Sequence, residues 1–149
     1  MTDPRYKKLA EIIVRHSCAV SKGDKVLVET IDIPSDFTVV LVRTISEAGG
    51  LPLCLTKQNA ILRELYRQAT EEQMRFWGEV ELKQMEGVAA YVGVRGSHNA
   101  TELSDVPADK MEIYQKLLWL PVHTETRIRK TRWVVMRWPT PSMAQQARM

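Results

Sequence analysis

One strand–helix–strand unit, between residues 25 and 56, constrains the fold of this chain more than any other feature. Its first strand, Lys25 to Ile31, is mostly apolar, as is typical of a strand buried on both faces of a parallel sheet. The amphipathic helix that follows opens with Ser35 as its expected cap and ends at Gly49-Gly50. Leu51 to Thr56 forms the second strand. Two strands joined in this way are parallel with a right-handed crossover, so the unit predicts an α/β fold.

The remaining segments extend this unit in the order β-α-β-α-α-β-α-β. Helices are expected at about 4–20, at 59–68, from a capping box at Thr70 to Gln73, and from Ser104 onward. A third strand is expected at 88–94 and a final one at 133–138, after a polar, basic connection at 122–130. The pattern predicts a three-layer α/β domain with a mainly parallel, doubly wound sheet of about four strands, similar to flavodoxin and Rossmann folds.

The composition indicates a globular protein without a membrane anchor. Of 149 residues, 44% are hydrophobic and 26% are charged, which is typical of folded domains and not of disordered chains. No apolar run is long enough to cross a bilayer, and charges throughout the first twenty residues exclude a secretory signal. Cys18 and Cys54 lie within apolar patterns and are expected in the core. A reducing, cytoplasmic setting is the simplest interpretation.

Positive charge is concentrated near the carboxyl terminus. The net charge is +3, and the segment from Val122 onward contains six Lys or Arg residues but Glu125 as its one acid. Such a segment attracts nucleic acid in some proteins, but no aromatic reader motif accompanies these charges. Contact with an acidic partner domain, or plain solvation, is the preferred interpretation.

The three histidines do not form a metal-binding pattern. The chain has no H-E-x-x-H motif, and His16, His98 and His123 are far apart in the sequence. His16 shares a helix face with apolar residues and is expected to pack there, whereas His123 in the basic connection is expected to be solvated. No catalytic residue and no metal ligand is therefore assigned to this chain.

The last stretch of the sequence changes from strand to helix. Trp133 to Trp138 reads as a strand, Pro139 and Pro141 end it, and Ser142 opens a helix that has barely begun at Met149. One tryptophan of this strand is expected in the core and the other on a contact surface. The pattern suggests an α/β domain over residues 1–138, with residues 139–149 as the start of a connection to a further domain.

Three stretches resemble the N-terminal domain of the aminopeptidase T family, which includes aminopeptidase S and related bacterial leucyl aminopeptidases. The most specific is T-R-W-V-V-M-R-W-P-T-P-S-M-A-Q from Thr131 to Gln145. The others are Y-x-x-L-A-x-x-I-V…S-x-G-D-K-V-L-V from Tyr6 to Val28 and E-L-S-D-V-P-A-D-K-M-E-I-Y from Glu102 to Tyr114. The resemblance implies a parent enzyme that removes N-terminal amino acids from peptides with two divalent metal ions, such as Zn, Co or Mn.

In that family the metal ligands come from a C-terminal catalytic domain, which the resemblance does not include. The resemblance therefore implies that the isolated chain is inactive. It also implies that the chain has two partners, this catalytic domain and a second copy in a homodimer. In the parent enzyme the chain would help to shape the cavity for peptide substrates. The residues expected to contact another domain or the dimer partner are Arg137, Trp138, Pro139, Pro141 and Met143.

Two alternatives remain open from the sequence. Arg95, Gly96, Ser97, His98 and Asn99 leave the third strand at its carboxyl end, the usual ligand side of an open α/β sheet. The first alternative is a non-catalytic module that binds a small anionic ligand at this loop, although neither G-x-G-x-x-G nor a Walker motif is present. The second is a truncated remnant with only structural or oligomerisation properties.

Overall fold

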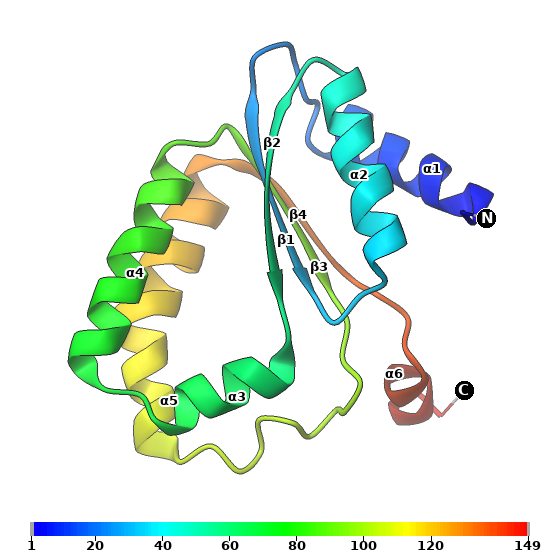
Figure 1. The fold of residues 1–149 in the computed structure, drawn as a ribbon. Coiled ribbons are helices and arrows are strands. Elements are labelled where there is room, and N and C mark those ends of the chain that lie inside the picture. Colours follow the sequence, from blue (N-terminus) through cyan, green and yellow to red (C-terminus); the bar gives the residue numbers. More distant parts are fainter. Residues whose placement is uncertain (1, 149) are drawn as a thin grey trace.

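The computed structural model describes residues 2–148, in which a parallel sheet lies between two layers of helices (Figure 1). Within these residues four strands are hydrogen-bonded in the order β2-β1-β3-β4, and each neighbouring pair is parallel. The strands are β1 (Lys25–Ile31), β2 (Leu51–Lys57), β3 (Ala90–Arg95) and β4 (Arg132–Arg137). The predicted fold class is confirmed. Met1 and Met149, the ends of the predicted domain ranges, lie outside the described residues.

The helices divide between the two faces of the sheet (Figure 1). On one face lie α1 (Pro4–Glu11), the wide-turn π-helix η1 (Ile12–Ser17) and α2 (Ser35–Glu47). On the other lie α3 (Asn59–Arg67), α4 (Glu71–Glu86), α5 (Ala108–Tyr114) and a second π-helix, η2 (Gln115–Ile128), while α6 (Pro141–Gln146) follows β4. The direction of winding reverses between β1 and β3, and open α/β sheets bind ligands at the carboxyl ends of the strands beside such a reversal.

The two inner strands supply side chains to both faces. In β1, Val26 and Val28 pack with Phe37 of α2, whereas Leu27 points to the opposite side and packs with Met85 of α4. Strand β3 alternates in the same way, and both strands are almost fully buried. This burial on both faces explains the apolar run from which the parallel sheet was predicted.

Helix η2 replaces the polar connection that was predicted for residues 122–130, and this prediction was wrong. The helix continues past Pro121 to Ile128. Pro121 has no N–H to donate, and it lies within the i to i+5 hydrogen-bond pattern of a π-helix. Its buried residues recur at helical spacing: Leu118, Val122, His123, Thr126 and Arg127. The polar composition therefore hides an amphipathic helix that packs on α4.

Gly78 of α4 permits this packing at close range. A β-carbon at position 78 would overlap the carbonyl oxygen of Leu117, so the two helices approach through the glycine. The N-terminus of α4 has the predicted capping box, in which Gln73 N donates to Thr70 Oγ1 at 3.1 Å. The predicted cap at Ser35 was wrong, because Pro34 is the N-cap of α2, and no side-chain cap bond forms there among the described residues.

Cys54, which was predicted in the core, and His16, which was predicted to pack on an apolar helix face, are both exposed. His16 lies on the outer side of η1, and Cys54 lies on β2, an edge strand whose outer border is not covered by another strand within residues 2–148. Cys18 is fully buried as predicted, and burial raises the pKa of its thiol to about 11. In the described part of the chain, no helix is both long and apolar enough to cross a membrane.

Candidate functional site

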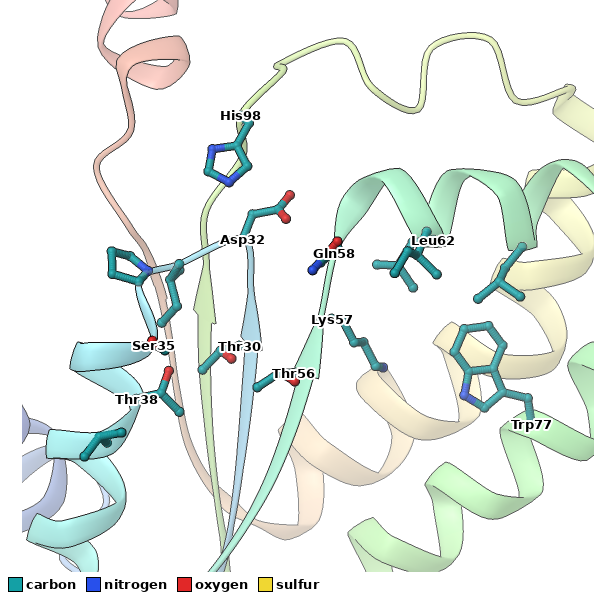
Figure 2. Close-up of a pocket in the computed structure, with 15 residues that line it drawn as sticks. Thr30, Asp32, Ser35, Thr38, Thr56, Lys57, Gln58, Leu62, Trp77 and His98 are labelled. Atoms are coloured by element: carbon teal, nitrogen blue, oxygen red, sulfur yellow. The ribbon is translucent and has the colours of Figure 1, made fainter.

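An open pocket of about 870 Å³ lies at the carboxyl ends of β1 and β2, between α2 and α3 (Figure 2). Thr30 and Thr56 project from the strands and Thr38 from α2, so that hydroxyl groups line one side of the pocket. The remaining lining alternates between polar and apolar side chains: Asp32, Ile33, Pro34, Ser35, Val39, Lys57, Gln58, Ile61, Leu62, Leu65, Trp77 and His98.

Asp32 is fixed at the mouth of this pocket by an unusual backbone conformation. Its φ of 50° is in the left-handed region, where Asp is tolerated better than most residues. The carboxylate accepts hydrogen bonds from Asn59 N at 3.2 Å and Asn59 Nδ2 at 3.0 Å, and the same Asn59 amide donates to the carbonyl of Gly96 at 3.2 Å. Asp32, Asn59 and Gly96 thus connect the ends of three strands at the edge of the pocket.

The pocket combines polar and apolar groups that suit a polar ligand. Its hydroxyls, the Asp32 carboxylate and the Gln58 amide offer donors and acceptors to a polar ligand, and Val39 and Ile61 add exposed apolar walls. Within residues 2–148 no group of three or more His, Cys, Asp or Glu residues is placed to hold a metal ion. The side chains present therefore do not fit a two-metal site.

A buried network of charges lies beneath the opposite face of the sheet. Lys57 Nζ contacts Glu29 Oε2 at 3.0 Å and Glu81 Oε1 at 2.6 Å, and Tyr91 donates its hydroxyl to Glu29 Oε1 at 2.9 Å. The Arg127 guanidinium stacks 3.7 Å from the Tyr91 ring centroid. Burial disfavours the charge of Glu29, but Lys57 and Arg127 outweigh it and lower the pKa of this carboxyl.

His123 belongs to this network, and the prediction that it is solvated was wrong. The ring stacks on Trp119 with centroids 4.0 Å apart, and its Nδ1 lies 3.2 Å from Arg127 Nη1. Burial, with the nearby charges of Arg127 and Arg95, lowers the pKa of His123 to about 4. The imidazole is therefore neutral at pH 7.

The sequence analysis missed this network, although one signal for it is present. Glu29 lies in the middle of a strand that is predicted to be buried on both faces. A buried carboxylate requires a cation or hydrogen-bond donors, because an isolated buried charge is very costly. Lys57, Glu81 and Arg127 come from three distant segments, so the sequence did not identify the partners.

The predicted loop from Arg95 to Asn99 divides between two environments. Ser97 and Asn99 are occupied within the chain: the Ser97 hydroxyl donates to the Asn99 carbonyl at 2.8 Å, and Asn99 Oδ1 accepts from Thr101 N at 3.0 Å. Gly96 N donates to the Ile31 carbonyl at 2.7 Å. His98 is exposed beside the large pocket, while Arg95 lines a smaller cavity on the other face. The structure therefore places Arg95 and His98 beside different cavities.

The predicted contact segment is partly buried in its own domain. Trp138 is 9% exposed and packs against Phe37 with centroids 4.7 Å apart, so it is a core residue of this chain. Arg137, Pro139 and Pro141 are exposed and Met143 is half-buried. Trp133, the other tryptophan of the strand, is 41% exposed. The hydroxyls of Thr140 and Ser142 donate to the Ser97 carbonyl at 2.7 and 2.5 Å and anchor the start of α6.

Comparison with known proteins gives two similarities. A model of the thermophilic metalloprotease (M29) family matches residues 2–148. The fold is also similar to wild-type AmpT from Thermus thermophilus, with a TM-score of 0.70 and 22% sequence identity. This similarity covers 92% of the present chain and 36% of the AmpT chain, so the chain spans about a third of that protein's length. No curated protein sequence matches significantly.

Proposed function

Because this chain belongs to the thermophilic metalloprotease (M29) family, we propose that it is the N-terminal domain of a metal-dependent aminopeptidase. The observation on which this proposal rests is the family match, which covers residues 2–148, nearly the whole chain. The match confirms the resemblance to the aminopeptidase T family that three sequence stretches indicated. The similarity to AmpT adds support at the level of the fold.

The metal chemistry is assigned to a part of the enzyme outside this chain. Two divalent ions, such as Zn, Co or Mn, would activate a water and polarise the scissile carbonyl there. The isolated chain is accordingly inactive as a peptidase in this proposal.

The pocket between α2 and α3 is the proposed contribution of this domain to the substrate cavity. A peptide presents backbone donors and acceptors together with side chains, and the pocket presents Thr30, Thr38 and Asp32 beside the apolar Val39 and Ile61. These groups bind and orient without taking part in bond cleavage. A change here is therefore expected to act mainly on KM.

The proposed contact with the catalytic domain uses the exposed Arg137, Pro139 and Pro141 and the half-buried Met143. Trp138 is buried beneath these residues and is not part of the contact surface itself.

The proposal also includes a homodimer and a cytoplasmic location. The location is supported by the free thiols of Cys18 and Cys54, which suit a reducing compartment.

The test compares the chain alone with a chimera in which it replaces the matched segment of AmpT. Hydrolysis of aminoacyl p-nitroanilides is measured with Zn, Co or Mn. We expect no hydrolysis by the chain alone and metal-dependent hydrolysis by the chimera. In the chimera, Thr38→Val should raise KM with little change in kcat, and Ser46→Ala on the outer side of α2 is the matched control. Metal-dependent hydrolysis by the isolated chain would contradict the proposal, as would a folded but inactive chimera.

A further inference from the structure

A cavity of about 150 Å³ lies at the carboxyl ends of the strands on the face opposite α2. Lys57, Ile31 and Arg95 form its floor as three register neighbours on β2, β1 and β3. Its walls include Asn59 of α3 and Trp119 of η2. A second, much smaller cavity shares part of this lining and extends to Arg127.

The charges around this cavity do not balance. Three cations, Lys57, Arg95 and Arg127, are placed among two carboxylates, Glu29 and Glu81. Lys57 contacts both carboxylates and Arg127 lies 4.0 Å from Glu29, whereas no carboxylate lies within 4.0 Å of the Arg95 guanidinium among residues 2–148. Arg95 is the cation left without an ion pair.

Two guanidinium nitrogens also lack hydrogen-bond acceptors. The Nε atoms of Arg95 and Arg127 are buried without an acceptor in the described chain, and Arg127 is 3% exposed. A buried donor without an acceptor is costly, so native structures normally satisfy it with protein, water or a ligand. The Arg95 guanidinium lies over Trp119, with its Cζ 5.4 Å from the ring centroid, a favourable cation–π contact.

We propose that this cavity binds a small aliphatic carboxylate, with the Arg95 guanidinium as its principal partner. A guanidinium matches a planar carboxylate through two parallel N–H···O bonds. Leu62 and Leu103 line the cavity and suit a short apolar body. A cavity of about 150 Å³ has room for a ligand of this kind. The cavity shares Lys57 and Leu62 with the lining of the large pocket, but Arg95 lines only the smaller cavity of the two. The proposal does not depend on the proposed peptidase role.

The experiment titrates the complete chain with isobutyrate and follows binding by calorimetry and amide NMR shifts. Isobutyramide tests the need for charge at constant shape, and inorganic phosphate tests the preference for a planar carboxylate. We expect saturable binding of one isobutyrate, with isobutyramide and phosphate each weaker by roughly tenfold or more, because each loses the paired charge-assisted bonds. Arg95→Gln should weaken isobutyrate binding by roughly tenfold or more.

Arg137→Gln is the matched control, because Arg137 is the register partner of Arg95 on β4 and is exposed. It should bind isobutyrate like the unmodified chain. Arg95→Lys keeps the charge without the planar guanidinium, and it carries the test if Arg95→Gln fails to fold; it should also bind more weakly. The proposal is overturned if isobutyrate does not saturate, as for a water-filled cavity, or if isobutyramide or phosphate binds as tightly. Equal binding by the Arg95 and Arg137 variants would also overturn it.

Discussion

Trp138 lies where α1, α2 and the end of β4 meet. Its ring is 5.4 Å from that of Tyr6 and 4.7 Å from that of Phe37, measured between centroids. Trp138→Ala would leave a cavity in this cluster, and we expect a loss of about 3–5 kcal/mol in the free energy of unfolding. Urea unfolding followed by far-UV circular dichroism measures this loss.

Trp133 provides the control on the same strand. It is 41% exposed, and its Nε1 donates to the Ile128 carbonyl at 3.2 Å. Trp133→Ala should therefore cost less, under about 1.5 kcal/mol, which is the scale of one hydrogen bond. Equal losses in the two variants would show that Trp138 is not the core residue described here.

His123 makes the stability of the fold depend on pH. Its pKa is about 4 in the folded state, whereas a histidine in an unfolded chain has a pKa of about 6.5. Between these values the unfolded chain binds more protons, so stability falls as the pH is lowered from about 6.5 to about 4. His123→Gln should remove this part of the pH dependence, measured as urea midpoints across the same pH range.

His16→Gln is the matched control for this titration. His16 is exposed on η1, on the face of the sheet opposite His123, so His16→Gln controls for the loss of a histidine outside the buried network. If the His123 and His16 variants lose stability in acid with the same slope as the unmodified chain, burial of the His123 imidazole is not the cause.

At the scale of elements, the contact between α4 and η2 depends on Gly78. Alanine favours a helix over glycine by about 1 kcal/mol, so propensity alone predicts that Gly78→Ala stabilises α4. Contact with the Leu117 carbonyl opposes this, because the new β-carbon has no space. We expect a net loss of about 1–3 kcal/mol, as for other overpacked sites, measured by urea unfolding.

Gly87, at the end of the same helix, is the control for this substitution. Its φ of −87° suits any residue, and a β-carbon there would be no closer than 3.6 Å to another atom. Gly87→Ala should therefore leave stability unchanged or raise it by about 0.4–1 kcal/mol. Stabilisation by both substitutions would contradict the close approach of α4 and η2 at Gly78.

Elements were predictable where local signals agreed with tertiary packing. The apolar run of β1 predicted a buried strand, Gly49-Gly50 predicted a helix end, and Thr70 to Gln73 predicted a helix start. The structure contains all three. Helix η2 was not predictable in the same way, because Pro121 and a polar composition argue locally against a helix. Packing on α4 outweighs these preferences, and packing is not visible in a window of sequence.

At the scale of the whole molecule, the sequence indicated which loops lie at the carboxyl ends of the strands, the end where open α/β sheets usually bind ligands. It did not indicate the cavities at that end. The position of residues 95–99 after a strand followed from the order of elements. Which of these residues face a cavity depends on β2 and α3, which the chain reaches some forty residues earlier. The separation of His98 from Arg95 onto different faces is thus a tertiary property.

The sheet should make unfolding a single event, because β1 and β3 contribute alternate residues to the cores on both of its faces. Trp138 lies on the α2 face, while Trp77, Trp119 and Trp133 lie on the α4 side. In Trp138→Ala, the remaining fluorescence therefore reports only the face opposite the substitution. We expect its urea midpoint to fall together with that from circular dichroism, by about 1–5 M for a loss of about 3–5 kcal/mol at a typical dependence of about 1–3 kcal/mol per M. A fluorescence midpoint that stays at the unmodified value while the dichroism midpoint falls would show that the two faces unfold independently.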